Sequence, residues 1–296
     1  MSQLSPVKRF HSQCIDCLLN KHFDKANLAK DDQTRLAYLQ GLLKILGEAD
    51  QTQTPSEVLD KITLLQKQLL DFEESFEEEK KYFNTLMLAK EDMMQSTVNS
   101  AQDKLHTALN LAMLGNYIDF GAMDSVSEDK LDEMLDTAKD LKFDDSEYAN
   151  LKSDLKNAKR LVYLTDNCGE IVADKLFIKT ILKEYPQISA EVIVKGKPVL
   201  NDATLEDAKQ IDLASVVKVS DNGCGMAGTV LEHISAEART KINSADIIIA
   251  KGQANFETLR HCGKNIYYIF MCKCNLFAQR FNVPRLSGMM LNDLRM

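Results

Sequence analysis

The sequence predicts an α/β protein in which an all-helical N-terminal domain precedes a doubly wound, mostly parallel sheet. In the first 150 residues, apolar residues recur three and four positions apart, and no strand-like alternation interrupts them. From residue 160 onward, short β-branched apolar runs alternate with helical stretches, a pattern typical of parallel strands buried on both faces. Charge divides in the same way, since residues 1–150 carry 28 acids and 16 bases (−12) and residues 151–296 carry 16 acids and 20 bases (+4), which sum to −8. We therefore expect a helical domain at 1–155 and an α/β domain at 156–296.

The helical domain begins with a leucine-rich stretch. Five leucines stand at helical spacing, namely Leu36, Leu39, Leu42, Leu43 and Leu46. The segment Thr54-Pro55-Ser56-Glu57 then combines a capping residue, a proline suited to the first helical position and a glutamate three residues after the cap. This pattern predicts a helix that begins at Pro55 and ends near Asp71.

Two further helices are expected before residue 150. The acidic run Glu73–Glu79 continues into two lysines, and Phe72, Phe76 and Phe83 are spaced for one helical face, so we interpret the run as the solvated surface of a helix. Ser127 is followed by two acids and predicts another helix start. The buried stripe of that helix would be Leu131, Met134, Leu135 and Ala138.

Five strands are predicted in the second half of the chain: Leu161–Thr165, Glu191–Lys195, Val216–Val219, Asp246–Ala250 and Ile266–Phe270. Right-handed crossovers between these strands would build a doubly wound sheet. Ligands bind beyond the carboxyl ends of the strands in such a sheet. The residues that directly follow each strand are therefore the candidates for chemistry.

Composition excludes several classes of protein. With 296 residues, 45% hydrophobic and 27% charged, the chain has ordinary globular usage and enough material for a core. A net charge of −8 argues against the basic surface that nucleic-acid binding needs. No run approaches the ~20 apolar residues of a membrane span, the polar start has no signal sequence, and seven cysteines, an odd number, indicate mostly reduced thiols. We expect a cytoplasmic protein without nucleic-acid or membrane partners, whose oligomeric state the sequence leaves open.

Polar clusters follow three of the predicted strands. They are Asp166-Asn167-Cys168-Gly169-Glu170, then Lys195-Gly196-Lys197-Pro198 with Asn201-Asp202, and Lys251-Gly252-Gln253-Ala254-Asn255. Asp166, Asn167 and Asp202 offer carboxylate and amide oxygens, which suit Mg²⁺ or Mn²⁺. Such an ion would neutralise phosphate oxygens, while Lys251 would hold the phosphoryl group and the helix that starts near Gly169 would add backbone donors and its positive dipole end. Aspartate and asparagine also suit helix caps and turns, and spacing alone supports both interpretations equally.

A glycine-rich loop raises a different function. Residues 223–228, Gly-Cys-Gly-Met-Ala-Gly, fit G-x-G-x-x-G, and Asp246 lies at about the right distance downstream for a ribose-binding acid. However, the motif follows the third strand, and Asp246 opens a strand instead of closing one. A nucleotide- or S-adenosylmethionine-binding transferase is therefore the alternative function, and a tight turn or an anion-binding loop is the alternative role of the glycines.

Cysteines raise two further hypotheses. Cys14 and Cys17 form a CxxC that could join Cys272 and Cys274 in a structural zinc site, although a pair of thiols on an N-terminal helix explains the motif better. Cys168 lies in the Asp166 loop, but no histidine stands near it in the sequence to activate it as a nucleophile.

Several of these motifs occur together in one known family. The chain resembles the damage-control phosphatases, long catalogued as domain of unknown function 89, and in particular their prokaryotic-type branch with an N-terminal CxxC. The resemblance rests on Cys14 and Cys17, on Leu-Gly-Asn-Tyr-Ile-Asp-Phe-Gly at 114–121, on the Asp166 cluster, on Lys195-Gly196 with Asn201-Asp202-Ala203-Thr204, and on Lys251-Gly252-Gln253-Ala254-Asn255-Phe256-Glu257. It spans essentially the whole chain. It implies a helical domain packed on a Rossmann-like α/β domain, with the active site between them.

The resemblance also implies roles for individual residues. The metal ligands would be Asp166, Asn167 and Asp202, and Lys251 would bind the substrate phosphate. From the helical half, Asn116 and Asp119 would reach the site. Weaker assignments are Glu170, Lys195, Gln253 and Asn255, which would either support the metal ligands from behind or contact the substrate. The loop at 221–225, Asp-Asn-Gly-Cys-Gly, departs from the Ser-Asn-Gly pattern usual in this branch.

The function implied by the resemblance is hydrolysis of small phosphomonoesters, either sugar phosphates or damaged phosphometabolites in metabolite repair. The cofactor would be Mg²⁺ or Mn²⁺, with Co²⁺ or Ni²⁺ as further candidates. A protein carboxyl methyltransferase activity has been attributed to one branch of the family, and a non-catalytic metabolite-binding protein is the third hypothesis. Either a metal-activated water or Asp166 could attack the phosphorus, and the sequence leaves both open.

Overall fold

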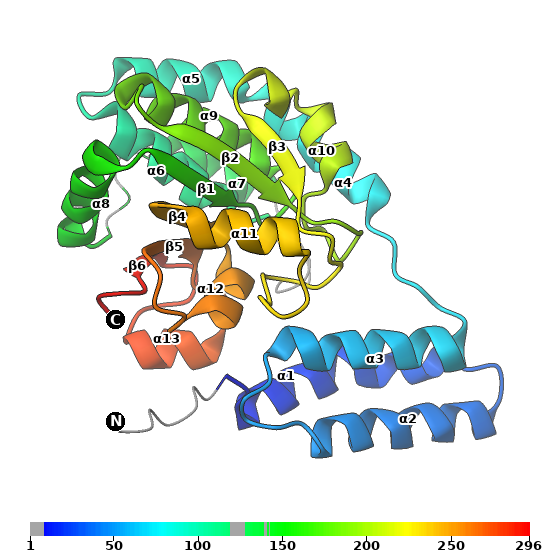
Figure 1. Cartoon of the computed structure of the whole chain (residues 1–296). Coiled ribbons are helices and arrows are strands. Elements are labelled where there is room, and N and C mark those ends of the chain that lie inside the picture. Colours follow the sequence, from blue (N-terminus) through cyan, green and yellow to red (C-terminus); the bar gives the residue numbers. More distant parts are fainter. Residues whose placement is uncertain (1–8, 119–127, 139–140, 142) are drawn as a thin grey trace, which may run out of the picture. The chain divides into compact units, whose positions relative to one another are not determined.

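The computed structural model describes residues 9–118, 128–138, 141 and 143–296. The chain divides into two compact units, Met1–Ser75 and Phe76–Met296 (Figure 1). This division differs from the boundary expected at 155. The reason is that helical residues such as Phe83, Leu105 and Leu151 share one apolar core with the sheet, so the helices after residue 76 belong to the α/β unit.

The smaller unit consists of α1 (Ser12–Phe23), a 3₁₀ helix η1 (Asp24–Leu28), α2 (Asp32–Gly47) and α3 (Pro55–Leu70). Helix α3 begins at Pro55 as predicted. The Thr54 backbone N–H donates to Glu57 at 2.7 Å and the Glu57 N–H donates to the Thr54 hydroxyl at 3.2 Å, which completes the capping box. The helix ends where Asp71 adopts a left-handed conformation with φ of 50°. The core of this unit contains Tyr38, Leu42, Leu46, Val58 and Ile62.

The acidic run does not form one helix. Helix α4 (Glu77–Ala89) starts only at the end of the run. Phe72 packs against the core of the smaller unit, whereas Phe83 belongs to the core of the larger one. The predicted common face of Phe72, Phe76 and Phe83 is therefore wrong, because the two units each bury a different phenylalanine.

The larger unit contains many helices and one six-stranded sheet (Figure 1). After α4, its helices are α5 (Glu91–Ser100), α6 (Lys104–Gly115), α7 (Glu128–Asp136), α8 (Asp145–Asn157), α9 (Glu170–Glu184), α10 (Leu205–Gln210), η3 (Leu213–Ser215), α11 (Ala236–Ser244), α12 (Gln253–Leu259) and α13 (Asn275–Phe281). Helix α7 begins where it was expected, and Leu131, Leu135 and Ala138 are buried. Ser127 and the side chain of Met134 lie outside the described part of the chain. None of the described helices has the length and apolar character needed to cross a membrane.

The sheet has the order β3-β2-β1-β4-β5-β6. Its strands are β1 (Arg160–Leu164), β2 (Ser189–Val194), β3 (Lys218–Asp221), β4 (Ile247–Lys251), β5 (Ile266–Met271) and β6 (Gly288–Asn292). The first five run parallel and match the predicted strands within two residues. Strand β6 pairs antiparallel with β5 and was not predicted. The strand order reverses between β1 and β4, which is where ligands bind in doubly wound sheets.

Both faces of the sheet are buried, which explains the uninterrupted apolar runs. Tyr163 and Ile249 face one core together with α6 and α9. Val162 and Ile248 face a second core, to which α11, α12 and α13 contribute. Figure 1 shows α6 and α9 on one side of the sheet and α11 and α12 on the other. The predicted Rossmann-like, mostly parallel α/β fold is confirmed.

Candidate functional site

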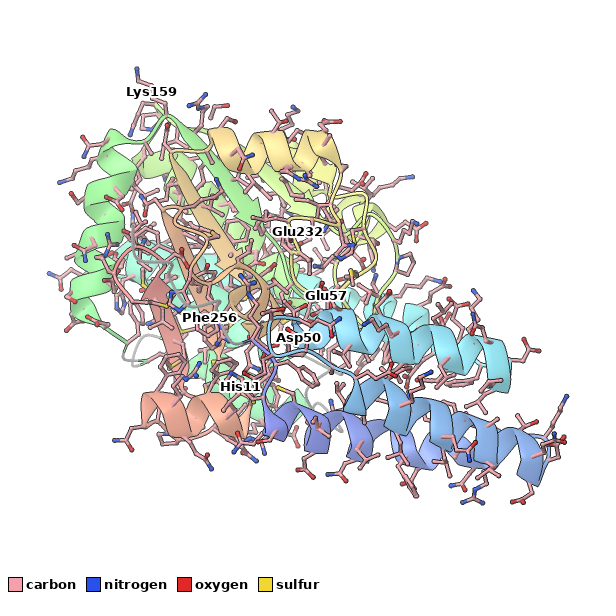
Figure 2. The ribbon with its side chains drawn as sticks, turned by 60° about the horizontal axis from the view of Figure 1, so that its bottom comes forward. His11, Asp50, Glu57, Lys159, Glu232 and Phe256 are labelled. Atoms are coloured by element: carbon pink, nitrogen blue, oxygen red, sulfur yellow. The ribbon has the colours of Figure 1, made fainter. Side chains whose placement is uncertain are left out.

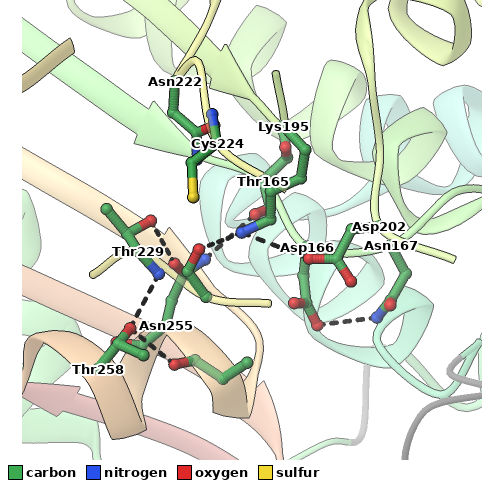
Figure 3. Close-up of polar contacts among 12 residues, drawn as sticks. Thr165, Asp166, Asn167, Lys195, Asp202, Asn222, Cys224, Thr229, Asn255 and Thr258 are labelled. Atoms are coloured by element: carbon green, nitrogen blue, oxygen red, sulfur yellow. Dashed lines mark hydrogen bonds and ion pairs between the residues drawn. The ribbon is translucent and has the colours of Figure 1, made fainter. Parts of the chain in front are cut away.

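The three predicted metal ligands lie together at the carboxyl edge of the sheet (Figure 3). Asp166 and Asn167 follow β1, and Asp202 lies in the loop after β2. A β-bridge joins Asn167 to Asp202, and the Ala203 N–H donates to the Asp166 carbonyl at 2.7 Å. The exposed fractions of Asp166, Asn167 and Asp202 are 4%, 2% and 4%. The two loops thus place two carboxylates and one amide side by side, largely shielded from solvent.

Two amides and a glycine fix the Asp166 carboxylate. Its Oδ2 accepts from Asn116 Nδ2 at 2.9 Å and from Asn167 Nδ2 at 2.8 Å. Gly252, with φ of 80° and ψ of 156°, sits directly against the same carboxylate, and an added Cβ would overlap it. This backbone region is essentially restricted to glycine. Asn116 therefore reaches the site from α6 as expected, while Asp119 lies outside the described residues.

Glu170, the first residue of α9, determines how Asn167 is oriented. Glu170 Oε2 accepts from Asn116 Nδ2 at 2.8 Å and from Asn167 Nδ2 at 3.0 Å. Asn167 Nδ2 donates to the carboxylates of both Asp166 and Glu170, and this fixes the orientation of the amide. Asn167 Oδ1 therefore faces away from these two carboxylates. Glu170 is completely buried and orients the two amides, in line with the supporting role that was one of its two expected roles.

Lys251, at the end of β4, is enclosed by buried acceptors. Its ammonium donates to Glu170 Oε1 at 2.6 Å, to Asp174 Oδ1 at 2.7 Å and to the Ala112 carbonyl at 2.8 Å. These contacts use its three N–H donors, and the side chain has 0% exposure. Burial opposes the charged form, but Asp174 and Glu170 outweigh it and raise the pKa of Lys251. Lys251 thus neutralises buried carboxylates, and a contact with substrate phosphate would require one of these bonds to be exchanged.

Asp174 is a site-associated residue that sequence reasoning missed. It lies one helical turn after Glu170 on α9, and this spacing of four was the available signal. The Tyr163 hydroxyl donates to its Oδ1 at 2.7 Å. Burial raises the pKa of Asp174 to about 7, with Lys251 opposing this shift and Glu170 adding to it.

The remaining predicted substrate contacts are distributed unevenly. Lys195 Nζ lies 3.3 Å from Asp202 Oδ2 and also donates to the Gly228 carbonyl, so this ammonium stands beside one of the predicted metal ligands. Asn255 is fully buried and donates to the carbonyls of Thr165 and Lys251 at 3.1 and 2.7 Å, so it joins the ends of β1 and β4. Gln253 accepts from the Lys273 and Cys274 N–H groups at 3.2 and 3.1 Å and joins α12 to the loop after β5.

The glycine-rich loop has packing reasons for its glycines. A Cβ added at Gly196 would overlap the backbone of Gly223, and a Cβ at Gly228 would overlap the Ala254 carbonyl. No helix follows the motif directly, since α11 begins at Ala236. Asp246 lies at the opposite edge, where it accepts from the N–H groups of Lys159 and Arg160; Lys159 marks this edge in Figure 2. The geometry therefore does not support the dinucleotide alternative.

The cysteine hypotheses gain no support either. No disulfide joins the seven cysteines. In the described part of the chain, no group of three or more His, Cys, Asp or Glu side chains is arranged to hold a metal ion. Cys168 has 0% exposure, and burial raises the pKa of its thiol well above the usual range, so it is a poor nucleophile. Two surface hollows, along α13 and where α5 meets α6, contain none of the site residues.

The donor set fits a hard divalent cation. Two carboxylates and one amide oxygen are ligands that Mg²⁺ and Mn²⁺ prefer, and three protein ligands leave positions for water and substrate. The N-terminus of the 15-residue helix α9 lies beside these ligands. The Gly169 N–H already donates to Asn84 Oδ1 and the Ile171 N–H to the Asn167 carbonyl. The helix terminus would therefore attract an anion through the positive end of its dipole, and these two N–H groups are not open donors.

Comparisons with known proteins identify the family to which the chain belongs. The damage-control phosphatase ARMT1-like domain matches residues 10–287. An uncharacterised protein of Methanocaldococcus jannaschii is 32% identical and covers 94% of this chain and 95% of its own length. Damage-control phosphatases of Archaeoglobus fulgidus and Pyrococcus horikoshii are 31% and 33% identical, covering 91% and 92% of this chain and 94% of each relative. The crystal structure of a DUF89 family protein from P. horikoshii aligns with a TM-score of 0.80 at 29% identity, over 96% of this chain and 99% of that one. The family expected from the motifs is thus confirmed, and the chain belongs to the ARMT1-like damage-control phosphatases.

Proposed function

We propose that the protein is a divalent-metal-dependent phosphatase that hydrolyses small phosphomonoesters. The observation that carries the proposal is the convergence of Asp166, Asn167 and Asp202 at the strand-order reversal, with Lys195 beside them. A phosphoryl group needs positioning and charge neutralisation more than covalent help, and these residues are suited to both.

The chain's own residues would divide the work. Asp166, Asn167 and Asp202 would hold a Mg²⁺ or Mn²⁺ ion, which when bound supplies positive charge for the phosphoryl oxygens. Asn116 and Glu170 keep Asp166 and Asn167 in one orientation through the hydrogen bonds described above. Because these contacts exist before any ligand arrives, little reorganisation is needed at the moment of reaction.

Lys195 is the side chain we assign to the substrate phosphate. Its ammonium is 3% exposed and already lies next to Asp202, so it would add a second positive charge close to the ion. Lys251 instead stays with Glu170 and Asp174 and maintains the buried framework.

The names of the relatives support a substrate class. Two of the relatives are named damage-control phosphatases. We propose sugar phosphates and damaged phosphometabolites as substrates, because a site built from small, buried polar groups suits a compact phosphorylated molecule.

The test is phosphate release from a panel of phosphomonoesters by metal-stripped protein, before and after Mg²⁺, Mn²⁺, Co²⁺ or Ni²⁺ is restored. Release should depend on the ion and disappear in Asp202→Asn. The matched control is Glu206→Gln, which neutralises an exposed carboxylate four residues further along the chain and should release phosphate at the wild-type rate.

Ion-dependent release lost only in Asp202→Asn would support the proposal and rank the substrates. Absence of release with every ion would refute it. Equal activity in metal-stripped and metal-restored protein would refute the metal dependence while retaining the phosphatase.

A further inference from the structure

A buried asparagine outside the predicted site contacts the loop that carries two of the proposed metal ligands. Asn84, on α4, has 0% exposure. Its Oδ1 accepts the Gly169 N–H at 2.6 Å, two residues after Asn167. Gly169 has φ of 67° and caps α9, so the turn that connects the metal ligands to this helix is held by a side chain from α4.

The other end of the Asn84 amide contacts the segment that follows the third proposed ligand. Asn84 Nδ2 donates to Asp207 Oδ1 at 2.9 Å and to Gln210 Oε1 at 2.9 Å. Asp207 Oδ2 in turn accepts from the Thr204 N–H and hydroxyl at 2.8 and 2.7 Å, just two residues after Asp202. A single amide therefore spans the loop after β1 and the start of α10 after the Asp202 loop.

We infer that Asn84 and Asp207 form a positioning pair that sets the spacing between the Asp166–Asn167 loop and the Asp202 loop, and so determines affinity for the divalent ion. The inference rests on the metal site of the proposed function. Asn84 accepts from the Gly169 N–H and Asp207 accepts from the Thr204 N–H, so the pair acts on the two loops through these backbone positions.

The chemistry of the pair is directional. Gly169 offers a donor and Asp207 offers an acceptor, so the bridging residue must accept on one side and donate on the other. An amide does both, whereas a carboxylate only accepts. Lys80 Nζ lies 2.7 Å from Asp207 Oδ2 and balances its charge in this buried position. The pair is thus fully satisfied, which is the condition under which buried polar networks hold one geometry.

The test exchanges the two groups. In Asn84→Asp, the new carboxylate still accepts from Gly169 but faces the Asp207 carboxylate, so the loops should separate. Adding Asp207→Asn gives a double variant with the same net charge as wild type, in which residue 207 donates to residue 84 and accepts from Thr204. The matched control is Asn99→Asp, the same change at an exposed position on α5.

The readout is Mn²⁺ affinity, measured by isothermal titration calorimetry on folded protein, with circular dichroism at each step. Changes in residues that orient metal ligands typically weaken binding roughly 10- to 100-fold. We expect a loss of this size in Asn84→Asp, recovery to within about threefold in the double variant, and wild-type affinity in Asn99→Asp. If Asn84→Asp does not fold, Asn84→Ala takes its place, with the double variant still expected to bind.

Wild-type Mn²⁺ affinity in Asn84→Asp or Asn84→Ala would overturn the positioning role and leave the proposed metal site intact. Weak binding in the double variant at unchanged circular dichroism would also overturn it, because restored complementarity should restore spacing. Absence of Mn²⁺ binding in the wild-type protein would overturn the proposed metal site itself.

Discussion

Replacement of Lys251 by methionine should destabilise the larger unit in a pH-dependent way. The ammonium is completely buried, and its removal leaves the Glu170 and Asp174 carboxylates facing each other with 0% exposure and no cation. Breaking a buried ion pair from one side costs about 3–5 kcal/mol, because an uncompensated charge stays in the interior. We expect a loss of this size in the free energy of unfolding at pH 7.5.

The loss should become smaller in acid. Burial already raises the pKa of Asp174 to about 7 against the attraction of Lys251. Because the folded-state value lies above the usual 3.8, the folded protein binds a proton more readily than the unfolded chain, and wild-type stability falls as pH rises from about 4 to 7. Without the lysine the pKa of Asp174 rises further, so at pH 7.5 the carboxyl of the variant keeps its proton, whereas the wild-type carboxyl has lost most of its proton. At pH 5.5 the carboxyl is neutral in both proteins. At about 1.4 kcal/mol per pH unit, the cost of Lys251→Met should therefore be roughly 1 kcal/mol lower at pH 5.5 than at pH 7.5.

The assay is urea unfolding followed by near-ultraviolet circular dichroism of tyrosine. Seven of the eight tyrosines lie in Phe76–Met296, so the signal reports on the larger unit. The control is Lys218→Met. The Lys218 side chain is 69% exposed and its Nζ lies 3.2 Å from Glu191 Oε2, so loss of this exposed ion pair should cost less than about 1 kcal/mol at either pH. A cost for Lys251→Met below that of the control, or one equal at both pH values, would refute the reasoning.

Three further predictions follow from local geometry. Gly252→Ala should lower the free energy of unfolding in urea by at least ~3 kcal/mol and abolish activity, because the added Cβ overlaps the buried Asp166 carboxylate. The control is Gly263→Ala, which has a φ of 74° but nothing within 4 Å of the added Cβ, and should cost only about 1 kcal/mol. Iodoacetamide followed by mass spectrometry should label the exposed Cys17 in the native protein and leave Cys168 unmodified until denaturant is added; native labelling of Cys168 would contradict its burial. Thr54→Ala should lower the stability of the smaller unit by about 1 kcal/mol through loss of the capping box, and an unchanged transition in calorimetry would argue against that cap.

Much of the fold could be predicted because it depends on local patterns. Proline at position 55 after a threonine cap predicts a helix start whatever the tertiary surroundings of the helix are. Uninterrupted apolar runs, such as the one at Ile247–Lys251, indicate strands that are covered on both faces. Strand β6 was missed because its burial comes from pairing with β5, at the edge of the sheet, and not from a pattern in its own five residues.

The proximity of the candidate metal ligands could also be predicted, because carboxylates and amides that follow parallel strands converge at one edge of the sheet. The roles of the cations could not. A lysine in sequence is a potential phosphate ligand in every loop, and only the tertiary structure shows Lys251 enclosed by Glu170, Asp174 and a carbonyl while Lys195 lies beside Asp202.

The sequence by itself determined the five parallel strands, the main helix starts, the family and the residue types at the sheet edge, since these depend on periodicity, capping and motifs within a few residues. The tertiary structure decided which helices share the core of the sheet, which charge neutralises which, and that Asn84 contacts Gly169 across 85 positions of the chain. Such contacts depend on the packing of distant segments. In a buried site, the electrostatic role of a side chain is set by the groups that surround it, and these come from segments far apart in the sequence.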